Sequence, residues 1–109
     1  MTGFTANTIV SALKDYEKCI KRGDYKEAES NIRVINISLM GDLEFEKIDY
    51  LVNYAHDVGK ADNDNGVRKS YEEVYEVLTA KCIEVGFATD ILEKHSRAII
   101  KGYELEFEN

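Results

Sequence analysis

Arg22-Gly23-Asp24-Tyr25 and Met40-Gly41-Asp42-Leu43 are the two stretches that decide the fold. Glycine ends helices, because without a Cβ it can enter the left-handed backbone region in which the last carbonyls are satisfied. Aspartate begins helices, because its carboxylate accepts hydrogen bonds from N–H groups of the first turn. Each Gly-Asp pair is therefore predicted to close one helix and open the next. Gly59 follows at the same spacing and is predicted to close a third helix.

Apolar residues recur at helical spacing between these glycines. The predicted helices are about residues 6–22, 24–39, 43–58, 67–85 and 90–103. Each has one apolar stripe that must be buried against another helix, and short connections make neighbouring helices antiparallel. The predicted fold is therefore all-α, a compact single domain over residues 1–109 built as a bundle of about five short-linked antiparallel helices.

Two pairs of acidic residues mark expected helix starts. Asp24 with Glu27, and Asp90 with Glu93, have the three-residue spacing of a capping box. A polar loop over residues 60–66 is expected between the third and fourth helices.

One passage also fits strands. Ile35-Asn36-Ile37-Ser38-Leu39 and Leu43-Glu44-Phe45-Glu46 both alternate apolar and polar residues, and Gly41-Asp42 between them could form a hairpin turn. Tyr103-Glu104-Leu105-Glu106-Phe107 alternates in the same way. The alternative is therefore an α+β fold with a small hairpin around residues 33–47.

Gly23-Asp24-Tyr25-Lys26-Glu27-Ala28 resembles the turn and second-helix start of a tetratricopeptide repeat. The resemblance covers one hairpin, roughly residues 12–35. It implies packing of a helix pair, and for function it implies peptide binding rather than catalysis.

Charge limits the classes of partner. The net charge is −7, but residues 1–40 have six basic and five acidic residues, a net of +1, whereas residues 41–109 have eight basic and sixteen acidic residues, a net of −8. Acidic proteins repel nucleic acid and anionic membranes, so we expect neither as a direct partner. Cys19 and Cys82 lie among apolar helix positions and are predicted to be free, buried thiols of a cytoplasmic protein.

Catalytic motifs are scarce. His56-Asp57 is similar to the metal-binding pair of HD-type phosphohydrolases, but that site needs further histidines and the chain has only His95 besides. His95 lies on an apolar helix face, where a core histidine with one satisfied nitrogen is expected. We therefore predict no enzyme activity, no metal and no cofactor.

The remaining candidate is an acidic, tyrosine-bearing surface. Three glutamates project away from the apolar stripe of the predicted fourth helix, and three carboxylates lie off the stripe of the third beside two tyrosines. Tyrosine gives a large contact area at low entropic cost, which suits a binding surface. The predicted partner-binding residues are Glu46, Asp49, Tyr50, Tyr54, Asp57, Glu72, Glu73 and Glu76.

These features favour a small acidic protein-interaction module that regulates or inhibits a partner protein through a basic surface of that partner. One alternative is a phage-type inhibitor that mimics nucleic acid, like anti-restriction or anti-CRISPR proteins, and blocks a basic channel. A second is a self-associating structural subunit, such as a homodimer. Its apolar contacts would come from residues off the main stripes: Val34, Ile37, Val77 and Ile100.

Overall fold

The computed structural model describes residues 6–38 and 43–108, without the side chains of residues 6–10, 33, 34, 36–38 and 43. The helices in these ranges are α1 (Ala6–Arg22), α2 (Tyr25–Ser38), α3 (Leu43–Asp64), α4 (Tyr71–Val85) and α5 (Thr89–Leu105), and the same ranges contain no strand. The all-α prediction is confirmed. The hairpin alternative is wrong for the described residues, because residues 33–38 and 43–47 are helical. The Gly41-Asp42 junction lies outside them.

Three helices end in the same way, on a glycine with a left-handed backbone. Gly23, Gly66 and Gly86 have φ values of 76°, 69° and 79° and follow α1, α3 and α4 respectively. In each case the residue after the glycine donates its N–H to a carbonyl in the last turn, which satisfies an acceptor that the helix end leaves unpaired. These bonds run from Asp24 to Cys19 (2.9 Å), from Val67 to Asp62 (2.8 Å) and from Phe87 to Cys82 (2.8 Å).

The starts of α2 and α4 are set by side-chain caps. Asp24 Oδ1 accepts the Glu27 N–H at 3.2 Å, so the predicted Gly23-Asp24 junction is confirmed. α4 begins later than predicted. Ser70 Oγ accepts the Glu73 N–H at 3.2 Å, and Glu73 Oε1 accepts the Ser70 N–H at 2.9 Å. This reciprocal capping box places the start of α4 after Ser70 rather than at residue 67.

The start of α5 differs from the prediction. Ala88 is its N-cap and makes no side-chain capping bond, and Asp90 lies inside the first turn. The predicted Asp90–Glu93 capping box is therefore wrong. The Asp90 carboxylate still lies at the end of the helix where negative charge is favourable.

Gly59 does not end a helix. α3 continues through it to Asp64, so most of the predicted 60–66 loop is helical. A Cβ added at Gly59 would lie 2.8 Å from the Tyr103 carbonyl oxygen and 3.1 Å from Glu106 Cβ. Glycine is present here because the end of α5 lies directly against α3, and the Gly59 prediction fails for that reason.

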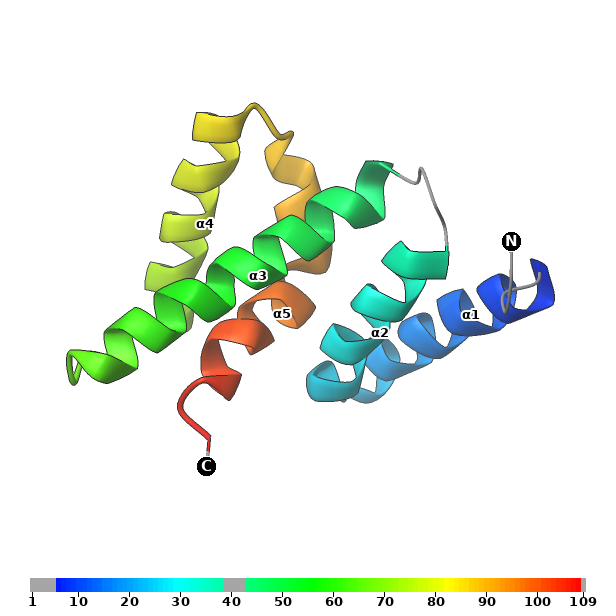
Figure 1. The fold of residues 1–109 in the computed structure, drawn as a ribbon, viewed down its shortest axis with the longest axis horizontal. Coiled ribbons are helices and arrows are strands. Elements are labelled where there is room, and N and C mark those ends of the chain that lie inside the picture. The colour runs from blue at the N-terminus through cyan, green and yellow to red at the C-terminus, as the bar shows by residue number, and fades with distance from the viewer. Residues whose placement is uncertain (1–5, 39–42, 109) are drawn as a thin grey trace.

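α3 and α5 are the central pair of the fold. α1 and α2 form one antiparallel hairpin, α4 and α5 form another, and α3 runs diagonally across the molecule past both (Figure 1). α2 packs on α5 and α3, whereas α1 packs mainly on α2.

The predicted apolar stripes supply the core. Its fully buried large side chains include Ile32 and Ile35 of α2, Ile48, Leu51 and Val52 of α3, Leu78 of α4, and Leu92, Ile99 and Tyr103 of α5. Ile100, which was expected to be left over for self-association, is also buried. Val77 is half-buried, and the side chains of Val34 and Ile37 lie outside the described residues.

Replacing Gly59 with alanine tests the close contact of α3 with α5. Helix propensity alone favours alanine by up to about 1 kcal/mol. The added Cβ must push the Tyr103 backbone away, and such overpacking costs typically about 1–3 kcal/mol. We therefore expect Gly59→Ala to lower the free energy of unfolding by about 1–2 kcal/mol in urea titrations.

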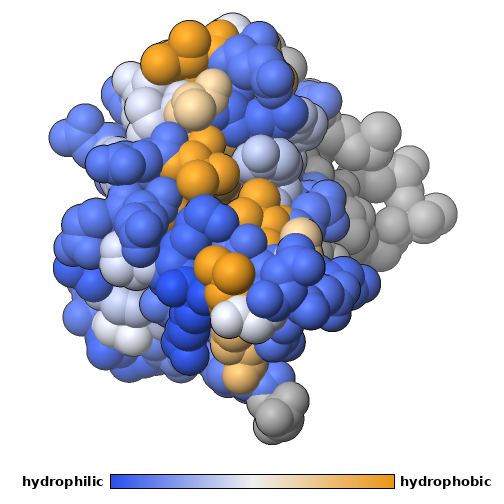
Figure 2. Space-filling view, turned by 90° about the vertical axis from the view of Figure 1, so that its left-hand side faces the viewer, coloured by the Kyte–Doolittle hydropathy of each residue, from blue (hydrophilic) through white to orange (hydrophobic). Residues whose placement is uncertain are grey.

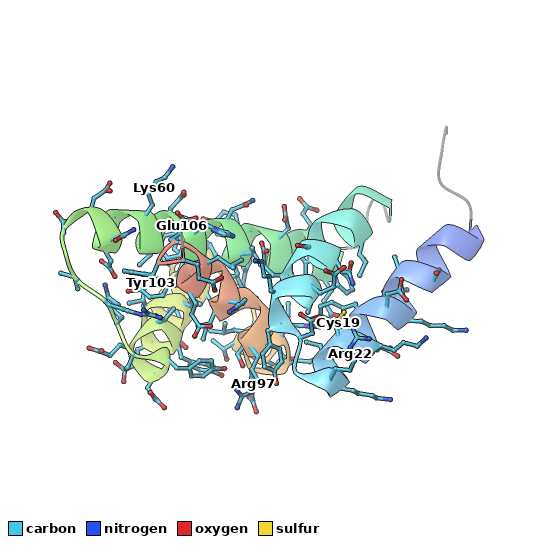
Figure 3. The ribbon with its side chains drawn as sticks, turned by 90° about the horizontal axis from the view of Figure 1, so that it is seen from below. Cys19, Arg22, Lys60, Arg97, Tyr103 and Glu106 are labelled. Atoms are coloured by element: carbon cyan, nitrogen blue, oxygen red, sulfur yellow. The ribbon has the colours of Figure 1, made fainter. Side chains whose placement is uncertain are left out.

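Lys60→Ala is the matched control, because Lys60 is the next residue of α3 and projects away from the fold (Figure 3). It should change stability by less than about 0.5 kcal/mol. A Gly59→Ala protein as stable as wild type would refute the close contact.

Candidate functional site

α3 buries one side and exposes the other, which decides where its predicted binding residues lie. Ile48, Leu51, Val52 and Ala55 are fully buried, as predicted. Glu46, Tyr50 and Asp57 lie on the exposed side, whereas Asp49 and Tyr54 are half-buried. Tyr50 is 41% exposed, and no other aromatic side chain among the described residues is as open.

Tyr50 lies beside a small groove. Its ring meets the ring of Phe87 edge-on, with centroids 5.3 Å apart and planes at 77°. Glu46, Lys47, Tyr50 and Phe87 line a hollow of about 190 Å³, which we call the α3 groove. Lys47 Nζ lies 5.5 Å from the centroid of the Phe87 ring. Two of the predicted residues, Glu46 and Tyr50, are therefore brought together with two that were not predicted.

Phe87 reaches the groove because of the helix end before it. Gly86 is left-handed, and Phe87 is the residue that donates back to the Cys82 carbonyl. An apolar residue at this position commonly contacts the last turn of the helix that it follows, and here the Phe87 ring also meets Tyr50 of α3. The Gly86-Phe87 pair was thus a readable signal, although it does not specify which helix the ring contacts.

Tyr54 is covered by a cation. Lys81 Nζ lies 4.9 Å from the centroid of the Tyr54 ring and 2.5 Å from Glu84 Oε2. The hydrogen bond to Glu84 raises the pKa of the Lys81 ammonium. The surface predicted as acidic therefore includes two lysines, Lys47 and Lys81, that lie against its aromatic rings.

The α4 glutamates form a separate patch. Glu72, Glu73 and Glu76 are exposed on the first two turns of α4, whereas Lys81 and Phe87 lie at its other end. At 1.5 Å per residue, Glu72 and the last residue of α4 are about 20 Å apart along the helix. Glu73 is held in the capping box, and the hydrogen bond from the Ser70 backbone lowers its pKa.

The side of the molecule where α4 and the end of α3 lie is mainly hydrophilic, with apolar side chains in a broken line (Figure 2). The exposed aliphatic side chains among the described residues are Val67 and Ile83. They lie in different segments, Val67 after the end of α3 and Ile83 on α4, and single exposed apolar side chains are ordinary for a protein surface.

His95 is buried, as predicted, with one nitrogen satisfied. It is 6% exposed, and its Nδ1 lies 2.7 Å from the hydroxyl of Tyr16, which is 5% exposed. Phe45 completes a cluster of three rings from α5, α1 and α3, with centroids 5.7–5.9 Å apart. α5 leaves helical geometry at His95, where φ is −116° and ψ is 16°. The bond between Tyr16 and His95 joins positions 79 residues apart in the chain.

Burial keeps both members of this pair neutral. It raises the pKa of the Tyr16 hydroxyl far above its ordinary value, and the negative charge of Glu44 adds to that effect. Burial also lowers the pKa of His95, with Glu44 opposing and Lys94 reinforcing the shift. The Tyr16 hydroxyl therefore keeps its proton. The Glu44 carboxylate 3.5 Å from Nε2 favours the neutral tautomer with its proton on Nε2, and in that tautomer Nδ1 accepts the hydrogen bond from the Tyr16 hydroxyl.

His56 of α3 bonds to α2 and to the residue that follows α5. Its Nδ1 lies 2.6 Å from Glu106 Oε2 and its Nε2 lies 3.2 Å from Glu29 Oε1. Glu29 is 7% exposed, so a buried carboxylate is paired with this ring. Glu106 follows the last turn of α5 and lies against α3 (Figure 3). Asp57 is exposed instead, so His56 and Asp57 do not converge as a metal-binding pair would.

The remaining candidate ligands and thiols also lie in the described parts of the chain. No three of their histidine, cysteine, aspartate and glutamate side chains are grouped so as to hold a metal ion. Cys19 and Cys82 are free and buried, as predicted, and burial raises the pKa of the Cys82 thiol.

The chain matches no protein-family model, no curated protein and no solved structure. None of the described helices combines the length and apolar character needed to cross a membrane.

The protonation of His95 predicts a pH dependence of stability. The unfolded chain takes up a proton on this ring near pH 6.5, whereas the folded protein does so only at lower pH. Stability is therefore lost as the pH falls below about 6.5, at up to about 1.4 kcal/mol per pH unit.

Urea titrations between pH 4.5 and pH 8 would measure this slope, and His95→Gln should reduce it. Glutamine can still accept a hydrogen bond from Tyr16 but does not titrate. An unchanged slope in His95→Gln would show that burial of His95 does not cause the loss.

Proposed function

We propose that the protein is a small acidic interaction module that regulates or inhibits a partner protein, without catalysis of its own. The α3 groove is the proposed docking site. The single observation that supports it is the open ring of Tyr50 beside the Glu46 carboxylate, at a hollow shared with Phe87.

Other aromatic rings of the protein indicate what Tyr50 would bind. Cations lie 4.9–5.6 Å from the ring centroids of Tyr25, Tyr54, Tyr71, Phe87 and Phe107. Arg97, for example, projects from α5 and lies 5.6 Å from the rings of both Tyr25 of α2 and Tyr71 of α4 (Figure 3). No such cation is found over Tyr50 among the described residues, although its ring is the most open.

An arginine or lysine of a basic partner surface would complete this arrangement. Its cation would lie over the Tyr50 ring, and Glu46 beside the ring would pair with it. A cation–π contact is worth about 0.5–1 kcal/mol when exposed and about 2 kcal/mol or more when desolvated in an interface. The net charge of −7 favours approach to a basic surface.

The alternatives fit the surface less well. A nucleic-acid mimic needs carboxylates that are not compensated, whereas Lys47 and Lys81 lie among the carboxylates of this surface. Self-association was expected to use apolar residues off the main stripes, but one of these, Ile100, is buried in the core and cannot contact a second copy. Both alternatives can be tested. A nucleic-acid mimic must compete with nucleic acid for the same partner protein, and a self-associating subunit must have the mass of a dimer in solution.

Two double variants separate the α3 groove from the α4 glutamates. Glu46→Lys with Tyr50→Ala alters the groove, and Glu72→Lys with Glu76→Lys makes a charge change at least as large elsewhere. Glu73 is left intact because its substitution would remove the α4 cap. We expect the groove variant to weaken partner binding by at least about tenfold. We expect the α4 variant to retain most of the binding.

The measurement is quantitative affinity capture from a lysate of the source organism, followed by titration of the identified partner, with thermal melts to check that each variant folds. Loss of binding in the α4 variant alone would move the docking site to Glu72 and Glu76. A partner bound equally by both variants would refute both acidic surfaces.

A further inference from the structure

A second hollow lies between α1, the start of α3 and α5. It has a volume of about 370 Å³. Leu13, Ile20 and Phe45 form its apolar wall, and Tyr16 and His95 form its buried polar part. This volume is within the range of small-molecule sites, about 300–1,000 Å³, and exceeds the roughly 150 Å³ cavity that binds benzene in an engineered protein. It shares no residue with the α3 groove.

The buried imidazole of His95 has one nitrogen without a hydrogen bond. Nδ1 is bonded to Tyr16, but no described atom completes a hydrogen bond to Nε2. Glu44 Oε2 lies 3.5 Å from Nε2, too far for a well-formed bond. Buried polar groups are normally paired, because a buried donor without an acceptor loses the hydrogen bonds that water gave it. The hollow therefore contains a buried donor whose only nearby acceptor among the described residues is the Glu44 carboxylate at this long distance.

The geometry limits the chemistry of that acceptor. Because Tyr16 donates to Nδ1, the Nε2 atom presents an N–H to the hollow. The charged residues of the lining are two acidic and two basic, Glu17, Glu44, Lys21 and Lys94, so the hollow as a whole favours a ligand without net charge. At Nε2 itself the nearest charge is the Glu44 carboxylate, 3.5 Å away, which disfavours a second negative charge at that atom. A neutral carbonyl oxygen accepts the same hydrogen bond without that repulsion. The rings of Tyr16, Phe45 and His95 around the site favour edge-on contacts with another aromatic ring.

We propose that this hollow is a binding site for a small uncharged aromatic molecule whose carbonyl oxygen accepts a hydrogen bond from His95 Nε2. The site binds and does not react, because a tyrosine hydroxyl that keeps its proton is a poor nucleophile. This inference is independent of the α3 groove and of its partner.

Probes of similar size test the proposal. Benzamide has the ring and a neutral carbonyl, toluene has the ring without an acceptor, and benzoate has the ring with a negative charge. A ligand of this size is expected to bind with a dissociation constant on the order of 1 mM. Loss of one neutral hydrogen bond should make toluene about 3- to 10-fold weaker than benzamide. Benzoate should also be weaker than benzamide.

Binding is measured by titrating each probe into the isotope-labelled protein and following backbone and imidazole resonances. Benzamide should shift the signals of Leu13, Phe45 and His95 in a saturable way. His95→Phe should remove the preference for benzamide over toluene, because it keeps a ring and removes the donor. Leu13→Trp fills the hollow and leaves His95 unchanged, so it should weaken the binding of both benzamide and toluene.

Tyr50→Ala is the matched control from the α3 groove and should bind benzamide like wild type. No saturable shifts with benzamide, or equal affinity for benzamide and toluene, would overturn the proposal. Saturable shifts confined to residues away from the hollow would overturn it as well. Loss of partner binding in the groove variants, by contrast, bears only on the α3 groove.

Discussion

The close contact of α3 with α5 is the constraint on which the rest of the structure depends. Each helix contributes a glycine to it. A Cβ at Gly59 would meet the Tyr103 carbonyl at 2.8 Å, and one at Gly102 would lie 3.1 Å from the His56 ring and 3.3 Å from the Val52 carbonyl. The missing side chains let the two backbones approach, and the space between them admits His56 with its two carboxylates.

This contact also determines what α3 can present elsewhere. With one side buried against α5, α3 directs Glu46 and Tyr50 outward, and its N-terminal turn places Phe45 beside Tyr16 and His95. The same helix therefore contributes to the α3 groove on one side and to the hollow at His95 on the other. Neither site needs a loop to form it, because the lining side chains come from helices or, for Phe87, from the residue after a helix cap.

The sequence predicted the helices and their buried stripes well. An apolar stripe can be recognised within a single helix, and burial of that stripe is what stabilises the helix in the fold. It predicted Gly23 correctly and Gly59 wrongly, since glycine serves both helix ends and close helix contacts. Only tertiary structure distinguishes the two roles. The periodicity of each helix shows which of its residues face outward, but it does not show whether the outward faces of two helices meet. The separation of Glu46 and Tyr50 from the α4 glutamates therefore could not be predicted from the sequence. The partners of His95 and His56 were missed for the same reason: Tyr16, Glu29 and Glu106 are far from them in the chain.

The glycine caps have a further consequence for the order in which the molecule assembles. Each of Gly23 and Gly86 links two helices that are adjacent in the chain, so the α1–α2 and α4–α5 hairpins close over short loops and are expected to form early. Gly59 meets Tyr103 from a distant part of the sequence and is expected to do so late. A contact absent from the folding transition state acts mainly on the unfolding rate. The lifetime of the folded state, rather than the rate of folding, is thus expected to depend on Gly59 and Gly102, two residues that have no side chain.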